Sequence, residues 1–207
     1  MGYKFHPELA THPTKEKKRD ALESLMFLKV KREGGVKGWT FADGRKQYKK
    51  VVTGDATYPT VYTESVLITA TIDAYEGRDA GICDILGAFL SADMDKDAKM
   101  ALCGSLAELM VKLAPQIYIH HMIYEKGWPV LYVILNKSLY SCLRSGLLFY
   151  ERLVADMRGK GFELNPYYPC VANKMIGGKK MILYWNVYDL KVSHVDPKEI
   201  TNFMEWI

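Results

Sequence analysis

Two strand-like runs on either side of a glycine pair decide the fold: CVANKMI at residues 170–176 and KMILYWNV at residues 180–187, with Gly177-Gly178 between them. Both runs are rich in apolar, β-branched or aromatic residues, and a Gly–Gly pair suits the tight turn of a hairpin. A third run, LKVSHV at 190–195, follows closely. We therefore expect antiparallel strands here, with Asp189 at the point where one strand turns into the next.

Working outward, helical spacing, caps and terminating glycines predict helices, and short apolar or β-branched runs predict strands. The expected helices are Ala21–Glu33, Ser65–Glu76, Leu106–Leu113, Gln116–Glu125, Arg144–Arg158 and a last helix that begins at Pro197. We expect Thr63 to cap the second of these helices, Gly77 to end it, and its buried residues to be Val66, Ile68, Ala70, Ile72 and Ala74. The other expected strands are 80–86, 99–102 and 129–135, while 37–52 forms a basic hairpin or a loop. This mixture predicts an α+β fold, a mostly antiparallel sheet with helices on one face.

Composition and charge narrow the classes of protein that fit. The chain is 49% apolar and 25% charged, which is ordinary for a globular protein. We expect no membrane association, since no apolar run approaches the roughly 18–20 residues of a membrane span. The absence of a signal-like apolar core and the unpaired spacing of four cysteines favour a cytoplasmic protein with reduced thiols.

The charge is uneven along the chain. The first 50 residues hold 13 basic and 6 acidic side chains, a net charge of +7, and the remainder carries −3. A basic segment of this kind suits a phosphate-rich partner such as nucleic acid, but a solvated lysine-rich surface has the same composition.

Two acidic residues stand in or beside apolar strands. Asp84 lies in the run AGICDIL at 80–86, and Asp189 lies between two expected strands. Two carboxylates at neighbouring strand ends can hold a divalent cation through oxygen ligands. Solvent-facing or salt-bridged acids would give the same spacing, so both alternatives stay open on these residues alone.

From about Ala21 onward the chain resembles the reverse transcriptase domain of copia-type retrotransposon polyproteins. The resemblance rests on six blocks in the family's order: ADGRKQ at 42–47, PTVYTES at 59–65, DILGAFLSADMD at 84–95, LNKSLYSCLRSGLLFY at 135–150, NPYYPCVANK at 165–174 and WNVYDLKVSHVD at 185–196. It implies, over 19–207, a polymerase palm with part of the fingers and without a thumb. Residues 1–18 are polar, carry two prolines and show no periodicity, so we expect a flexible lead-in there.

The implied activity is that of an RNA-directed DNA polymerase working on an RNA or DNA template with a primer. A primer 3′-hydroxyl attacks the α-phosphate of a deoxynucleoside triphosphate, and two Mg²⁺ ions assist the displacement. The resemblance assigns the metal to Asp84, the backbone carbonyl of Ile85 and Asp189. It makes Phe89 the aromatic residue that excludes a 2′-hydroxyl, for which plain core packing is the alternative.

The resemblance also assigns basic residues to substrate binding. Lys37, Arg45 and Lys46 fall in the fingers segment, where cations hold the triphosphate. Lys137 and Arg144 border the nucleotide and template, where each contacts a phosphate or caps a helix. For the three fingers residues, solvated surface charge is an equal alternative.

The sequence departs from the family at several positions. Tyr188 stands where the metal-binding hairpin has the first of two aspartates, and a phenol with a pKa near 10 does not replace a carboxylate. Ser141 stands for a glycine in a turn that favours positive φ, and Trp39 stands for an arginine. We therefore expect an impaired or inactive polymerase.

Two other functions fit the sequence. One is a non-catalytic remnant of the same element that binds nucleic acid through its basic first third. The other is a small-molecule enzyme or regulatory domain that matches the motifs by chance. Because palms pack against a thumb, we also expect exposed apolar residues such as Phe203 or Trp206, and self-association through them.

Overall fold

The computed structural model describes residues 5–7, 13–46, 57–94 and 98–207. The chain divides into two compact units, and each draws on two separate segments. Unit 1 comprises 1–56 and 89–148, and unit 2 comprises 57–88 and 149–207. Most of the predicted lead-in, the part of the predicted basic segment from 47 to 52, and Asp95 of the 84–95 block lie outside the described residues.

A sheet of six strands organises unit 1. The strand order is β1 (Phe5–Pro7), β7 (Trp128–Leu135), β5 (Lys99–Cys103), β2 (Leu22–Val30) and β3 (Val36–Ala42), with β6 (Ile123–Glu125) also paired to β7. The pairs are antiparallel except for β2 and β5, which run parallel at Leu22 and Glu23. The predicted strands at 99–102 and 129–135 are thus confirmed.

The main core of unit 1 lies on one face of this sheet. Alternate residues of β5 and β7 pack there with helix α4 (Ser105–Leu113), whose Ala107 is fully buried. The core residues from the strands are Leu22, Met100, Leu102, Leu131, Val133 and Leu135. Side chains of a strand alternate between faces, so Ala101, Val130 and Tyr132 form a second, smaller cluster on the other face.

Short helices and turns complete unit 1. They are α1 (Lys15–Asp20), η1 (Gly44–Lys46), α3 (Ala88–Ser91, which begins at the last residue of the 57–88 segment), α5 (Pro115–Tyr118) and η2 (Ile119–His121). Helix α1 begins at Lys15 and ends at Asp20, so it extends past residue 18, the expected end of the flexible lead-in. The predicted helix over 116–125 is wrong in its second half, where the chain becomes strand β6.

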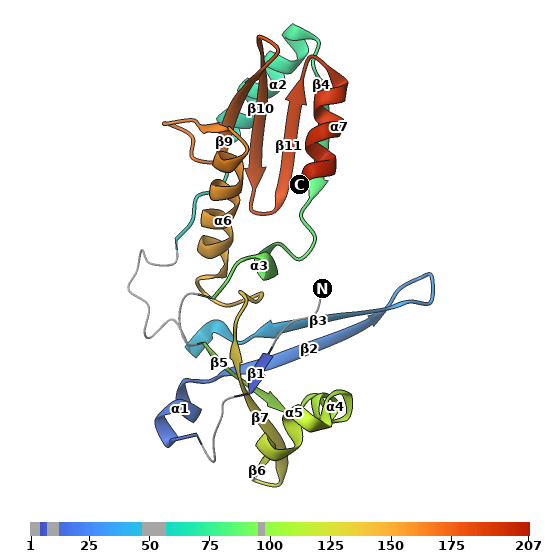
Figure 1. The fold of residues 1–207 in the computed structure, drawn as a ribbon, viewed down its shortest axis with the longest axis vertical. Coiled ribbons are helices and arrows are strands. Elements are labelled where there is room, and N and C mark those ends of the chain that lie inside the picture. Colours follow the sequence, from blue (N-terminus) through green and yellow to red (C-terminus); the bar gives the residue numbers. More distant parts are fainter. Residues whose placement is uncertain (1–4, 8–12, 47–56, 95–97) are drawn as a thin grey trace. The chain divides into compact units, whose positions relative to one another are not determined.

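The predicted helix over 21–33 is wrong, because this segment forms strand β2 of a hairpin with β3. Gly34, with φ of +83°, lies in the turn, and Phe27 pairs in register with Trp39. Figure 1 shows the pair as a long two-stranded ribbon. Apolar residues at helical spacing are also compatible with a strand, where they fall on both faces. Here the aromatic residues of β3, which follows the Gly34-Gly35 pair, provide cross-strand partners, so the segment forms a strand.

A five-stranded antiparallel sheet organises unit 2, and Figure 1 labels four of its strands, β4, β9, β10 and β11. Its order is β4 (Asp79–Asp84), β11 (Asp189–His194), β10 (Lys179–Asn186), β9 (Val171–Ile176) and β8 (Glu163–Leu164). The predicted hairpin around Gly177-Gly178 is confirmed, with both glycines at positive φ. The strands predicted at 80–86 and 190–195 are confirmed as β4 and β11.

Helices cover both faces of this sheet, so the prediction of helices on one face is wrong. On one face α7 (Pro197–Trp206) packs so closely that a Cβ on Gly81 would lie 2.9 Å from Ile200. On the same face Trp185 meets Tyr150 of α6 (Ser145–Gly159), with ring centroids 6.3 Å apart. Lys191 points the other way and pairs with Asp73 of α2 (Thr63–Glu76).

Helix α2 begins and packs differently from the prediction. Its N-cap residue is Tyr62 rather than Thr63, although Gly77 ends it as predicted, with φ of +61°. The buried residues are Ser65 and Thr69, whereas the predicted Ile68, Ala70 and Ala74 are exposed. The hydroxyl of Thr69 is satisfied inside the helix, since it donates to the Ser65 carbonyl at 2.8 Å, which makes a polar face compatible with burial.

Helix α7 is confirmed, but its aromatic residues are not exposed. Asp196 caps it by accepting a hydrogen bond of 3.0 Å from the Lys198 amide. Phe203 is only 5% exposed and its ring centroid lies 5.7 Å from that of Phe162. Lys160 covers Trp206, with its amine 4.8 Å from the ring centroid. The expectation of an apolar surface at these two residues is therefore wrong.

Candidate functional site

The two aspartates predicted to meet lie directly opposite each other in unit 2. Asp84 is the last residue of β4, Asp189 is the first residue of β11, and the antiparallel register pairs them. Both side chains are exposed. Just beyond the pair, the Ile85 amide donates to the Tyr188 carbonyl at 3.1 Å. The chain thus presents two carboxylates at one end of the sheet.

The turn between β10 and β11 positions the second aspartate. Asn186 pairs with Asp189, so Val187 and Tyr188 form a two-residue turn. Val187 has φ of +57°, an unusual conformation for a β-branched residue. Tyr188 is partly buried at this turn, next to Asp189.

Two carboxylates face each other across the β4–β11 pair at this end of the sheet. Like charges directly opposite each other on antiparallel strands repel. Burial raises the pKa of the neighbouring Cys83 thiol, and the negative charge of Asp84 raises it further. A divalent cation with oxygen ligands would relieve the repulsion between the carboxylates.

The ligand set is smaller than the resemblance implies. Within the described ranges, no group of three or more His, Cys, Asp or Glu residues is placed to hold a metal ion. The Ile85 carbonyl, the expected backbone ligand, accepts a hydrogen bond of 3.2 Å from the Ala88 amide. Two exposed carboxylates fit one hydrated divalent cation. The pair of Mg²⁺ ions that the resemblance implies has a further shared carboxylate at the position of Tyr188, and the residues present do not supply it.

The cations predicted to bind phosphate belong to unit 1, and two of them are held by acids. Arg45 makes a two-pronged contact with Asp43, with Nε to Oδ1 at 2.9 Å and Nη2 to Oδ2 at 2.5 Å. This hydrogen bonding raises the pKa of Arg45 above its usual value. Lys137 pairs with Asp93 at 2.5 Å. Sequence reasoning missed both acids, although Asp43 and Asp93 stand inside the quoted blocks.

The remaining residues predicted to bind substrate also belong to unit 1. Phe89 lies on α3 and packs edge to face against Tyr140, with ring centroids 4.8 Å apart, a contact that supports the core-packing alternative. Arg144 is partly buried just before α6, and its carbonyl accepts from the Leu148 amide at 3.0 Å. Lys37 lies on β3 and Lys46 in η1, and their side chains lie outside the description.

Two of the positions at which the sequence departs from the family pattern, Ser141 and Trp39, lie in unit 1. Ser141 has φ of +68°, which confirms that this turn adopts the conformation that a glycine favours. Trp39 is partly buried on β3, opposite Phe27.

No family model, curated protein or solved structure matches the chain. Among the residues that the structure describes, none of the helices combines the length and the apolar character needed to cross a membrane. All four cysteines carry free thiols: Cys83, Cys103, Cys142 and Cys170.

Proposed function

We propose that this chain is the fingers and palm of a copia-type reverse transcriptase whose nucleotidyl-transfer site is incomplete. The observation that carries the proposal is the register that sets Asp84 opposite Asp189. Two residues far apart in the sequence, each in a block that resembles the family, meet at adjacent strand ends. A chance match of the motifs gives no reason for this pairing.

The residues of the same site support the proposal that polymerase activity is lost. Two-metal phosphoryl chemistry needs carboxylates that bridge both ions, and Tyr188 stands at the position of one of them. We assign no catalytic step to the chain as it stands, because the two carboxylates do not fit two Mg²⁺ ions. Bound Mg²⁺ at this site is proposed as a single, weakly held ion.

The proposed partners are an RNA or DNA template with its primer and deoxynucleoside triphosphates. Their phosphates would have to compete with Asp43 for Arg45 and with Asp93 for Lys137. Both partners of the Lys137–Asp93 pair are exposed, so this exchange costs little. Arg45 is exposed but Asp43 is only 11% exposed, so taking Arg45 away removes the ion-pair partner of a largely buried carboxylate and costs more. A non-catalytic remnant that binds nucleic acid is the second candidate function, favoured by the lack of a third metal-binding acid within the described residues.

Primer extension with the Tyr188→Asp variant tests the proposal. We expect no incorporation by the natural chain in Mg²⁺, and a gain of at least about 10²-fold when the carboxylate is restored. Tyr75→Asp on α2 is the matched control, because Tyr75 is fully exposed there and should give no gain. Asp84→Asn added to Tyr188→Asp should abolish the gain. No gain from Tyr188→Asp would overturn the proposal of an incomplete polymerase site.

Nucleic-acid binding separates the two candidate functions. Steep loss of primer–template binding with rising salt, without incorporation by Tyr188→Asp even in Mn²⁺, would favour the binding remnant. Absence of binding at low salt would contradict both.

A further inference from the structure

A cavity of about 680 Å³ lies in unit 2 between α2 and the face of the sheet formed by β9 and β10. Its walls are mixed, with polar residues beside an apolar group made up of Ile68, Ile72, Val171, Met175 and Ile182. The cavity is open to solvent on one side, where Ile68 and Met175 are exposed. Sites for small molecules are clefts or cavities of about 300–1,000 Å³. The size therefore fits a small-molecule site.

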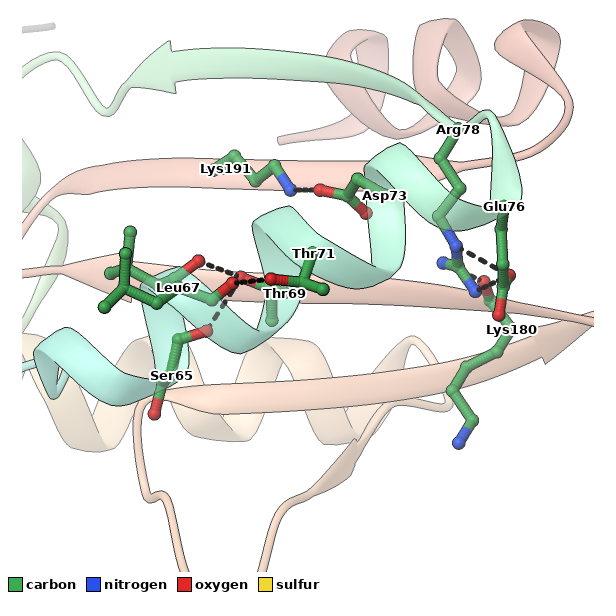
Figure 2. A network of polar contacts seen from close by, with 10 residues as sticks. Ser65, Leu67, Thr69, Thr71, Asp73, Glu76, Arg78, Lys180 and Lys191 are labelled. Atoms are coloured by element: carbon green, nitrogen blue, oxygen red, sulfur yellow. Dashed lines mark hydrogen bonds and ion pairs between the residues drawn. The ribbon is translucent and has the colours of Figure 1, made fainter.

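One end of the cavity holds a buried arginine. The side chain of Arg78 is only 3% exposed. Its Nε and Nη2 donate to Glu76 at 2.9 and 2.8 Å, and its Nη1 donates to the Lys180 carbonyl at 2.7 Å (Figure 2). These bonds use three of the five N–H groups of a guanidinium, which leaves two that can donate to an anion.

The charge at this end is positive. Lys179 and Lys180 line the cavity together with Arg78, and the acidic lining residue is Glu76. Three cations against one carboxylate leave an excess of positive charge beside the apolar group. Guanidinium groups bind carboxylates through two parallel hydrogen bonds, so this end is suited to a carboxylate head group.

The other end of the cavity has an unsatisfied hydroxyl. Ser65 lies in the first turn of α2, is 3% exposed and lines the cavity. Within the part of the chain that the structure describes, its Oγ has no hydrogen-bond partner. Buried hydroxyls are normally hydrogen-bonded, so Ser65 marks a position where an occupant of the cavity supplies a polar atom or an ordered water.

We propose that this cavity binds a small amphiphilic carboxylate, with its head group at Arg78 and its apolar body against the isoleucine side chains. The inference is independent of the polymerase proposal. Lys180 lies near the first residue of β10, and Asn186, beside the acid pair, is its last residue, a separation of about 20 Å along the strand. A ligand in the cavity therefore does not need the acid pair.

A titration of the ¹⁵N-labelled full chain followed by NMR tests the proposal. The probes are octanoate and 2-naphthoate, which distinguish an alkyl from an aryl body, and the uncharged 1-octanol. We expect saturable shifts confined to the cavity residues with at least one carboxylate, and affinity for 1-octanol at least about tenfold lower because it lacks the charge. Equal affinity for octanoate and 1-octanol, or shifts spread over the β2–β3 hairpin, would overturn the proposal.

Two variants with matched controls locate the site. Ile68→Trp places a large ring at a residue that lines the cavity and should weaken octanoate binding about tenfold. Leu67→Trp, at the preceding exposed residue of α2, which does not line the cavity, should change it less than twofold. Arg78→Lys keeps the positive charge but removes the planar guanidinium group, so it should weaken octanoate binding about fivefold. The control is Arg152→Lys, at an exposed ion pair on α6, which should leave the affinity unchanged. Circular dichroism checks that each variant is folded. Unchanged affinity in folded Ile68→Trp and Arg78→Lys would place the probe elsewhere and refute the site.

Discussion

Two hairpins of this protein share a glycine pair at the turn and differ in almost everything else. The β2–β3 hairpin of unit 1 turns at Gly34-Gly35, and Phe27 and Leu28 of its first strand are 58% and 68% exposed. The β9–β10 hairpin of unit 2 turns at Gly177-Gly178, and Leu183 of its second strand is completely buried. The difference shows that the turn sets the pairing, whereas burial depends on the helices available to each strand.

The surroundings of each hairpin explain this contrast. Strands β9 and β10 belong to a sheet with α6 and α7 on one face and α2 on the other. Among the described strands, the outer part of β2, from Leu25 to Val30, pairs with β3 alone, since β5 reaches only Leu22 and Glu23. A two-stranded ribbon cannot bury either face by itself, so its apolar side chains stay in solvent.

The largest difference between the hairpins should appear on truncating a leucine. Leu183→Ala removes a fully buried side chain and leaves a cavity, so it should lower the free energy of unfolding by about 2–5 kcal/mol. Leu28→Ala, the same change on the exposed hairpin, should cost less than about 0.5 kcal/mol. Urea unfolding measures both. Equal losses would mean that the β2–β3 hairpin is covered in solution.

High pH should weaken the buried hairpin through a cysteine. Burial raises the pKa of Cys170, just before β9, to about 11, so the folded state holds this proton more tightly than the unfolded state. The resulting stability is fully present below about pH 9 and is lost as the pH rises through about 11, by about 1–3 kcal/mol. Unfolding at about pH 8 and pH 10.5 measures the loss. Cys170→Ala should reduce it, and Cys103→Ala, at an exposed cysteine, should leave it unchanged.

The turn glycines should differ in their tolerance of a side chain. Gly178 has φ of +74°, so Gly178→Ala should cost about 1–2 kcal/mol. Gly35 is not at positive φ, and a Cβ there would meet only Lys31 at 4.0 Å, so Gly35→Ala should be close to neutral. Thermal unfolding compares the two variants. A large loss from Gly35→Ala would contradict the turn geometry of the exposed hairpin.

The smallest effect concerns the end of the sheet opposite the β9–β10 turn. Asp84→Asn removes the like charge facing Asp189 and should stabilise unit 2 by about 0.2–1 kcal/mol without metal. Mg²⁺ should raise the melting temperature of the natural chain slightly and that of Asp84→Asn less. Asp79→Asn, at the other end of β4, is the matched control. An equal response to Mg²⁺ in all three would argue against a cation at the acid pair.

The sheet of unit 2 and the acid pair could be predicted because their signals are local. The Gly177-Gly178 turn, the β-branched runs and the position of Asp189 between strands each depend on a few neighbouring residues. The register that brings Asp84 to Asp189 followed from the family blocks, not from periodicity.

Other features could not be predicted because they depend on distant contacts. Leu22, Leu25 and Leu28 fit a helix as well as a strand, and only the pairing with Trp39 and Phe41 decides between them. The buried face of α2 is set by the strands it meets, so its small polar residues gave no signal. The acids that hold Arg45 and Lys137 are recognisable only once side chains are placed.

The order of strands in unit 2 has a consequence for folding during synthesis. Within the described part of the chain, strand β4 is an edge strand that pairs only with β11, and β11 is synthesised after the other described strands. Until then neither edge of β4 has a partner strand, and its Ile82 is exposed. Contacts between such distant segments form slowly and leave aggregation-prone intermediates. A chain from which β11 is still missing should therefore aggregate more readily than one in which β4 and β11 have paired.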